Sequence, residues 1–304
     1  MSIKVKRFQE AQGAISFLEK LALGGSSTVV FRGHSNETFR LVNTWQRHRI
    51  IPHESWMTDI DEALTKFKIG LEKLGILSHN HEDRYESLEH GRHHGVPTPC
   101  HDFSYSPYVA LFFAFNEVQK NNKARKHDYS VVYALNINQL AQAWAHRFSD
   151  PRTDNDLFYR LFWGFQSPPD DFLEKCYPSE TLQFLPFPGK KNIRMQRQLG
   201  ALLYDTLNYK RMGFSDLEEF IGSIVEPRYN DGTKEMPGEP TLHKIYINHK
   251  CISDIFQRLE LMNITGGNLY NNGDGVAMDI KNSYYYNAKF SYLKDVKIPI
   301  PQDM

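Results

Sequence analysis

The chain has 304 residues, of which 40% are hydrophobic and 13% aromatic, and this content of ring side chains excludes a disordered chain. Its 36 Lys and Arg equal its 36 Asp and Glu, and the resulting net charge of zero argues against a general nucleic-acid coat or a polybasic membrane binder. At roughly 100–200 residues per domain, the length fits one large domain or two small ones.

Hydrophobic spacing predicts the elements of the first half of the chain. Apolar residues recur at helical spacing over residues 7–23 and 59–77, which predicts two helices. Residues 28–31 are β-branched or apolar and predict a buried strand. Ser106 followed by proline is typical of a helix start, and we expect a buried helix from there to about residue 122.

The second half mixes further strands and helices. The predicted strands are residues 129–137, 201–204 and 242–247. The predicted helices are residues 139–148, 154–165, 193–198 and 252–262, with others beginning after Ser215 and near Gly267. Because no strict βαβ rhythm is present, the pattern predicts an α+β fold.

The cysteines and the apolar runs indicate a cellular compartment. Three cysteines stand at positions 100, 176 and 251 without a CxxC spacing, which favours a reducing compartment over a disulfide scaffold or a zinc ribbon. The first residues lack the apolar core of a signal peptide, and the most apolar run, residues 108–115, is far shorter than the ~20 residues that cross a bilayer. We therefore expect a soluble, cytoplasmic protein that does not enter a membrane.

Arg32 and Gly33 follow directly on the buried strand at residues 28–31. An arginine in such a place is costly unless its guanidinium meets an anion, such as a carboxylate or a phosphate. The glycine would let a ligand approach the backbone closely. The alternative is a structural arginine–carboxylate pair at the end of the strand.

A histidine cluster is the second candidate site. His90, His93 and His94 have the i, i+3 and i+4 offsets that place ligands on one helix face. Gly91 and Gly95 weaken a helix here, and neighbouring histidines point in different directions. The alternatives are a metal site, and histidines that pack and hold a turn.

Residues 101–107 form the third candidate, which we interpret as a polar turn that leads into the buried helix. Asp102, Ser104 and Ser106 could orient the ribose of a ligand or a partner histidine. Equally, Ser106 could cap the helix and Asp102 could brace the turn. No Ser/His/Asp triad, P-loop or GxGxxG fingerprint occurs in the sequence.

These motifs together resemble the FRG domain family. The resemblance rests on residues 31–33, 93–98, 102–114, 196–201 and 273–277, and it extends over residues 26–282. The chain departs from the family pattern at four positions of the second block, namely Arg92 for Gln, Pro99 for Arg, His101 for Leu and Ser104 for Thr.

The order of the motifs also resembles, more distantly, that of ADP-ribosyltransferases. This resemblance implies that Arg32 holds the diphosphate of NAD, that the Gly33 backbone holds the nicotinamide amide, and that Ser104 holds the nicotinamide ribose. It implies a catalytic glutamate as the third element, but Gln196 or Gln198 stands in its place. A neutral amide lacks the charge that stabilises an oxocarbenium-like transition state.

The resemblances lead to a prediction of fold and domains. We expect a single α+β domain with a mixed, split-type sheet surrounded by helices, similar to the ADP-ribosyltransferase fold. Residues 1–25 would add an N-terminal helix, residues 26–283 would form the FRG-like domain, and residues 284–304 would be a C-terminal extension.

The leading hypothesis is an enzyme that handles NAD or another nucleotide by ADP-ribosyl chemistry, in a bacterial or phage toxin or defence effector. The expected catalytic residues are Arg32, His93, His94, Asp102, Ser104 and Gln198, and the expected NAD-binding residues are Arg32, Gly33, Ser104 and Ser106. Two alternatives remain open: a non-catalytic module that binds a nucleotide or nucleic acid, and a metal-dependent hydrolase built on His90, His93, His94 and Asp102. We expect no structural zinc, because the cysteines are remote from one another.

A basic stripe bears on the choice of partner. Lys190, Lys191, Arg194 and Arg197 would share nearly one face of a helix and could contact nucleic acid. A solvated helix face, balanced by acidic residues elsewhere, is the alternative.

Overall fold

One mixed seven-stranded sheet organises the part of the chain that the computed structural model describes, namely residues 3–24, 28–48, 56–75, 88, 91–92, 94–118, 127–148, 162, 181–185, 192–207, 209–210, 212–224 and 240–283. The strands are β1 (Ile3–Phe8), β2 (Val29–His34), β3 (Cys100–Ser104), β4 (Tyr129–Asn136), β5 (Leu182–Leu185), β6 (Gly200–Asp205) and β7 (Leu242–Asn248). They lie in the order β1-β7-β4-β2-β3-β6-β5, and β1 is parallel to β7 while all other pairs are antiparallel. The predicted α+β class and mixed sheet are confirmed.

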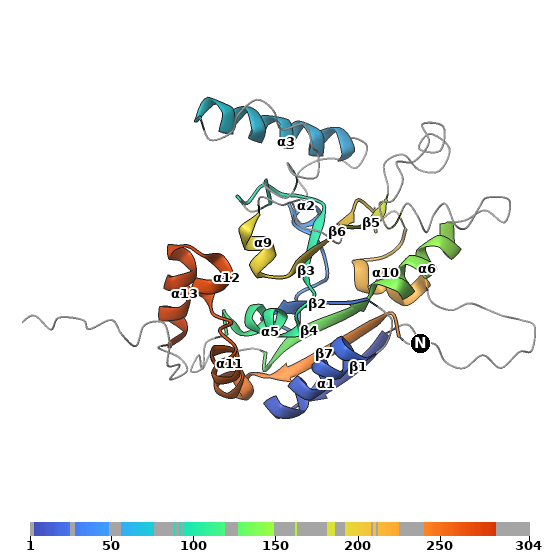
Figure 1. Cartoon of the computed structure of the whole chain (residues 1–304). Coiled ribbons are helices and arrows are strands. Elements are labelled where there is room, and N and C mark those ends of the chain that lie inside the picture. The colour runs from blue at the N-terminus through green and yellow to red at the C-terminus, as the bar shows by residue number, and fades with distance from the viewer. Residues whose placement is uncertain are drawn as a thin grey trace, which may run out of the picture.

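The sheet divides between β2 and β3. Strand β2 pairs with β4 from Val29 to His34, and β3 pairs with β6 from Cys100 to Ser104. Between β2 and β3, however, only Phe31 and Ser104 are paired. Figure 1 shows the two parts, with β1, β7, β4 and β2 below and β3, β6 and β5 above. The strands therefore separate beyond one shared point, and side chains can occupy the opening.

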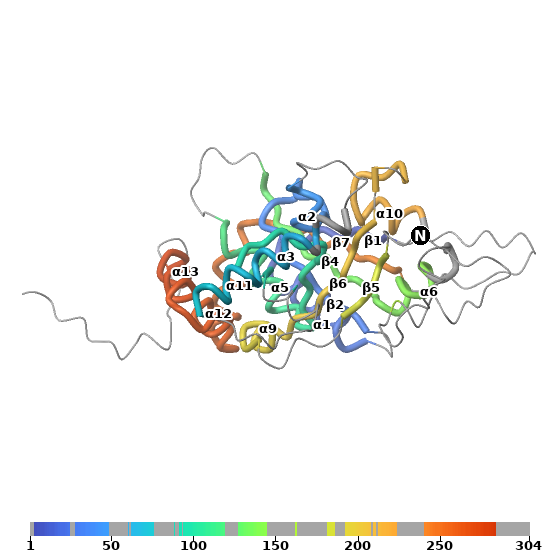
Figure 2. Tube along the Cα trace, turned by 90° about the horizontal axis from the view of Figure 1, so that it is seen from above, coloured from blue at the N-terminus to red at the C-terminus, as the bar shows by residue number. Residues whose placement is uncertain are grey.

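Helices surround this sheet. They are α1 (Ala11–Leu23), α2 (Thr44–Arg47), α3 (Trp56–Lys73), α5 (Pro107–Phe115), α6 (Ile137–Phe148), α9 (Ile193–Arg197), α10 (Leu217–Ile224), α11 (Ile252–Leu261), α12 (Gly266–Tyr270) and α13 (Gly273–Ser283), with a 3-10 turn, η2, at His249–Cys251. Seen from above, α12 and α13 lie at one end of the molecule and α6 and α10 at the other (Figure 2). No helix in the described ranges is long and apolar enough to cross a membrane.

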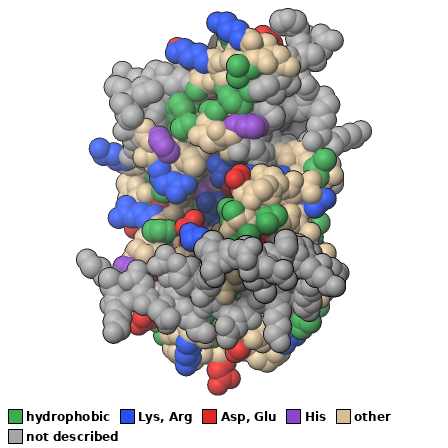
Figure 3. Space-filling model, turned by 90° about the vertical axis from the view of Figure 1, so that its left-hand side faces the viewer, with side chains coloured by type: hydrophobic (Ala, Val, Ile, Leu, Met, Phe, Trp, Pro, Cys, Tyr) green, Lys and Arg blue, Asp and Glu red, His purple; other side chains and the backbone are tan. Residues whose placement is uncertain are grey.

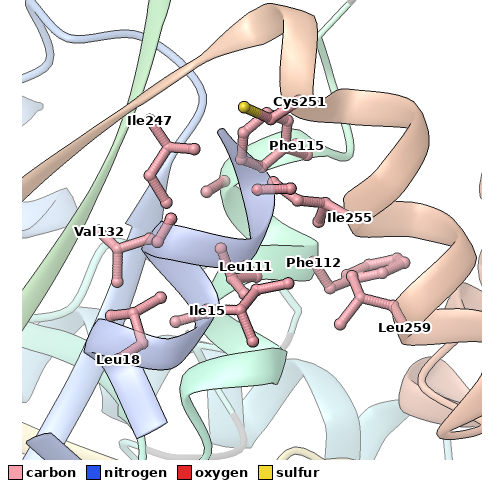
Figure 4. Packing of buried hydrophobic residues seen from close by; sticks show 14 of the residues in the cluster. Ile15, Leu18, Leu111, Phe112, Phe115, Val132, Ile247, Cys251, Ile255 and Leu259 are labelled. Carbon is pink, nitrogen blue, oxygen red and sulfur yellow. The ribbon is translucent and has the colours of Figure 1, made fainter. Parts of the chain in front are cut away.

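Helix α5 is the centre of the largest core. The Ser106 hydroxyl caps its first turn by accepting from the Val109 N–H, and proline occupies its first position. The helix is apolar on nearly all sides, so it is buried between the sheet, α1 and α11. Figure 4 shows this packing, in which Ile15 of α1 and Ile255 of α11 lie on either side of residues of α5.

A glycine pair brings α12 and α13 together. A Cβ atom on Gly266 would lie 2.4 Å from the carbonyl oxygen of Gly275, and one on Gly275 would lie 2.2 Å from that of Gly266. The carboxylate of Asp279 accepts hydrogen bonds from the backbone N–H groups of Gly266 and Gly267, each with a donor–acceptor distance of 2.7 Å. The close backbone contact and this cap fix α12 on α13.

The structure corrects several predicted boundaries. The helix predicted over residues 7–23 begins at Ala11, because Arg7 and Phe8 belong to β1 and pair with β7. The strand predicted over residues 28–31 continues to His34, because three further residues pair with β4. Helix α5 ends at Phe115 instead of near residue 122. Each of these boundaries depends on contacts outside the segment itself.

Three strands were missed, and the first is β1, because the segment over residues 1–25 was expected to supply only a helix. Residues 101–104, interpreted as a polar turn, lie in β3, because they pair with β6. Residues 182–185, in a proline-rich passage, form β5 at the edge of the sheet.

Two predicted helices have different outcomes. Asp216, one residue later than predicted, caps α10 by accepting a hydrogen bond from the Glu219 N–H at 2.9 Å. The helix predicted over residues 154–165 lies outside the described residues except for residue 162.

Candidate functional site

A pocket of about 360 Å³ lies where β2 and β3 separate. Strands β2 and β3, helices α5, α9 and α12, and Arg92 contribute to its lining. This volume is in the range of small-molecule sites, which is about 300–1,000 Å³. Figure 3 shows Lys and Arg side chains around a hollow near the middle of the face that it presents.

Arg32 enters the pocket from β2. Its Nη1 donates to the carbonyl oxygen of Asp102 across the opening at 2.8 Å, and its Nε donates to His34 Nε2 at 2.9 Å. Both acceptors are neutral, and no described carboxylate oxygen forms an ion pair with this guanidinium. Burial lowers the pKa of Arg32 to about 10, which the charge of Asp102 only partly offsets. The pocket thus contains a desolvated cation that forms no direct ion pair with a described carboxylate and whose charge Asp102 offsets only in part.

Gly33 has a packing role that the sequence did not reveal. A Cβ atom at this position would lie 2.0 Å from the carbonyl oxygen of Ala110 and 2.6 Å from the backbone nitrogen of Ala114. Only a residue without a side chain lets α5 lie this close to β2. Gly33 also lines the pocket, so a ligand contact by its backbone remains a prediction.

His34 completes the Arg32 side of the pocket. Burial and the neighbouring charge of Arg32 lower the pKa of His34 to about 3. At neutral pH the imidazole is therefore uncharged, and its Nε2 accepts from Arg32.

We expect this histidine to make the protein acid-sensitive. Its pKa is lower in the folded state than in an unfolded chain, where it is near 6.5, so the unfolded state binds the proton first and stability falls as the pH drops below about 6.5. Between pH 7 and pH 4.5 His34 alone should cost about 2–3 kcal/mol of unfolding free energy. The free energy of unfolding of the wild type and of His34→Gln, which keeps an acceptor for Arg32, is measured with urea at both pH values. Between pH 7 and pH 4.5 the variant should lose less of this free energy than the wild type, by the amount given above. An equal loss in the two proteins would disprove the assignment.

Arg92 and Asp102 form an ion pair at the edge of the pocket. Both carboxylate oxygens of Asp102 accept from Arg92, through its Nε and Nη2. Arg92 Nη1 also donates to the Thr44 hydroxyl at 3.2 Å, which fixes the arginine to α2. Burial opposes the charge of Arg92, but Asp102 outweighs it and raises the pKa of Arg92. The carboxylate of Asp102 is therefore paired with Arg92, and it offsets the buried charge of Arg32 only in part.

Ser104 and Gln198 lie together on the other side of Asp102. The Ser104 hydroxyl donates to the carbonyl oxygen of Gln198 at 2.7 Å and accepts from the Ser106 N–H at 2.9 Å. Gln198 follows α9, and its Nε2 donates to the carbonyl oxygen of Leu269 in α12 at 3.4 Å. Both side chains are mostly buried and line the pocket.

Helices α9 and α12 supply another part of the pocket lining. The guanidinium carbon of Arg194 lies 4.1 Å from the centroid of the Tyr270 ring. Tyr270 in turn contacts Phe113 of α5 edge-on, with centroids 6.2 Å apart. Glu117, which follows α5, lines the same pocket and is exposed. Together with α5 and the residues that follow it, α9 and α12 offer an arginine, two aromatic rings and one carboxylate to a ligand.

A second polar cluster is buried outside the pocket lining. His101 points to the opposite face of β3 from Asp102, and its Nε2 lies 2.8 Å from Asp205 Oδ2. The Tyr209 hydroxyl donates to the same oxygen at 2.7 Å, and Gln46 Nε2 approaches it at 3.4 Å. Burial lowers the pKa of His101, which Asp205 opposes. We assign this cluster to the stability of the β3–β6 pair, because it does not face the pocket.

The structure brings most of the predicted site residues together. Arg32, Gly33, Asp102, Ser104 and Gln198 all line the pocket.

Other predicted residues lie elsewhere. Ser106 caps α5 and is not among the lining residues. His94 is exposed and packs near Phe67, with ring centroids 5.9 Å apart, so it does not join the pocket. His90 and His93 lie outside the described residues, and so do Lys190 and Lys191 of the basic stripe. Within the described ranges, no group of three His, Cys, Asp or Glu side chains could hold a metal ion.

Sequence reasoning missed several residues of the pocket. Arg92 was noted only as a departure from the family pattern, and Arg194 only as part of a basic stripe. The contributions of His34, Glu117 and Tyr270 were not foreseen. His34 follows Arg32 and Gly33 directly, so its position in the sequence could have identified it as a pocket residue. Glu117 and Tyr270 join the site only through the folding of distant segments.

Comparison with known proteins adds one finding. The family model of the FRG domain matches residues 27–123. Neither the curated proteins nor the solved structures contain a match to the chain. The matched part includes β2, β3 and α5 but not α9 or α12, so it is shorter than the resemblance over residues 26–282. The segment that supplies Arg32, Asp102 and Ser104 thus matches the FRG domain family, as the sequence resemblance predicted.

Proposed function

We propose that the pocket binds a phosphorylated nucleotide, most concretely NAD, and supports ADP-ribosyl chemistry. The observation that carries the proposal is the desolvated charge of Arg32 in the pocket. Asp102 is occupied by Arg92, and no described carboxylate pairs with Arg32. An arginine fork matches a phosphate in charge and geometry, so an anionic ligand would supply the missing partner.

The electrostatic surroundings favour the same kind of ligand. Arg47 and Arg92 both lower the pKa of Arg32, so their positive charges lie close enough to raise the potential around it. The described lining contains three arginines and two carboxylates, Asp102 and Glu117, so it has an excess of positive charge in a chain whose net charge is zero. A cleft with such a potential attracts anions. Phe113 and Tyr270 add apolar surface on which a base or a nicotinamide ring could lie.

Two features support the ADP-ribosyltransferase hypothesis in particular. The sheet separates between β2 and β3, and the resemblance expects a split sheet. Arg32, Ser104 and Gln198, to which the resemblance gives the diphosphate, ribose and catalytic positions, all line one pocket.

The chemistry needs a negative charge that Gln198 does not have. When the bond between nicotinamide and ribose C1′ breaks, nicotinamide leaves with the electron pair, and positive charge develops on the ribose. The acceptor's oxygen or nitrogen then bonds to C1′ and releases a proton. Glu117 lines the pocket, and no described residue forms an ion pair with it. We assign the charge stabilisation to Glu117.

We expect Glu117→Gln to release nicotinamide from NAD about 10²–10³-fold more slowly than the wild type, with NAD affinity changed by less than about threefold. Chromatographic assay of free nicotinamide and calorimetric titration measure the two quantities. Glu62→Gln, on α3 and outside the pocket lining, is the matched control and should leave both unchanged. Equal turnover in wild type and Glu117→Gln would refute the role of Glu117.

The second candidate function is a binding module without catalysis. It is favoured by the neutral Gln198, whose amide is held by Leu269 in α12. Wild-type protein that binds NAD but releases no nicotinamide, with or without a candidate acceptor, would support it. A macromolecular acceptor and a toxin or phage-defence role follow only from the catalytic hypothesis.

A further inference from the structure

The pocket holds a second arginine that forms no direct ion pair with a described carboxylate. Arg194 lines it from α9, whereas Arg32 lines it from β2. Arg194 Nε is buried, and no described atom accepts a hydrogen bond from it. A buried N–H group without an acceptor costs free energy, which an anionic ligand in the pocket would recover. No described carboxylate pairs with Arg194, in contrast to Arg92.

We infer that Arg194 forms a second anion subsite, and that the pocket therefore selects a ligand with two linked phosphates over one with a single phosphate. This inference rests on the proposed function, in which Arg32 binds the first phosphate. A pocket of about 360 Å³ with arginines on different walls suits a compact diphosphate group held between them. The chemical class is a nucleoside diphosphate or a dinucleotide.

Arg194 is held in place before any ligand binds. Its guanidinium lies on the Tyr270 ring, a contact that fixes the plane of the fork. The helix that carries it is attached to α12 by two further hydrogen bonds, from Arg197 Nη1 to the carbonyl of Asn268 at 3.0 Å and from Gln198 Nε2 to that of Leu269 at 3.4 Å. A preorganised cation loses little conformational entropy on binding, so its contribution to affinity is larger.

The basic stripe thus has two kinds of members. Arg194 lines the pocket, whereas Arg197 is exposed, bonds to α12 and is not among the lining residues. The two arginines lie on the same short helix and carry the same charge. Because Arg197 also attaches α9 to α12, the charge control is instead Lys281, which is exposed on α13 and lies outside the pocket lining.

Calorimetric titration with AMP, ADP and inorganic pyrophosphate tests the inference. Arg194→Met should weaken ADP binding about tenfold or more, because a hydrogen bond to a charged group is lost, while AMP binding changes less than about twofold. Arg194→Lys should recover part of the ADP affinity. Lys281→Met removes one positive charge outside the lining and should leave all affinities within about twofold. Pyrophosphate shows whether the diphosphate alone gives the same pattern, and thermal melts show whether each variant is folded.

Different failures have different meanings. An equal loss of AMP and ADP affinity in folded Arg194→Met, or an unchanged ADP affinity, would overturn the second subsite and leave the proposed function standing. The same loss in Lys281→Met would also overturn it, because a general charge effect would then suffice. A wild-type protein that binds none of the probes at millimolar concentration would overturn the proposed function and the inference together.

Discussion

Replacing Arg32 with alanine should abolish binding of NAD or a related dinucleotide. The variant loses a charge-assisted, bidentate contact in a partly buried site, which costs about 2–5 kcal/mol, or roughly 30- to several-thousand-fold in affinity. Calorimetric titration of the wild type and of Arg32→Ala measures this loss. The fold should survive, because Arg32 forms its two described hydrogen bonds with neutral acceptors at the opening between β2 and β3.

Arg32→Lys and thermal melts complete the experiment. Lysine keeps the charge but not the planar fork, so it should recover only part of the affinity. If Arg32 is merely structural, the melting temperature should fall in Arg32→Ala while even the wild type binds no nucleotide. That pattern would refute the proposed function, whereas lost binding at an unchanged melting temperature would support it.

Gly33→Ala should destabilise the protein by about 3 kcal/mol or more, at the upper end of overpacking effects. The added Cβ would meet backbone atoms of α5, with the carbonyl oxygen of Ala110 at 2.0 Å and the nitrogen of Ala114 at 2.6 Å. These atoms belong to a helix buried among the sheet, α1 and α11, so the helix cannot move without disturbing the core. Urea denaturation followed by circular dichroism measures the change.

Gly70→Ala is the control for this substitution. Gly70 lies in α3, and a Cβ atom there would have no neighbour within 4 Å. Alanine also favours a helix interior by up to about 1 kcal/mol over glycine, so Gly70→Ala should be neutral or slightly stabilising. A Gly33→Ala protein as stable as the wild type would show that α5 does not need this close approach.

Local signals let the sequence predict the elements whose character lies within a few residues. Strand β4 was recognised from its continuous β-branched and aromatic run, and the start of α5 from Ser106 and the following proline. The polar motifs and the family resemblance together identified Arg32, Asp102 and Ser104 as candidate site residues, and all three line one pocket. Short motifs of this kind carry their own geometry, since caps and strand propensity act over one turn or a few residues.

Only the tertiary structure decided how these pieces meet. Arg7 and Phe8 join a strand instead of a helix because β7, far along the chain, supplies their backbone partners. Asp102 is 70 residues from Arg32, and it contacts that arginine through its backbone while its carboxylate goes to Arg92. Arg194 and Tyr270 complete the pocket because α12 packs on α9. Pairings between distant segments depend on the whole fold, and no local pattern of residues specifies which charged side chain forms an ion pair and which does not.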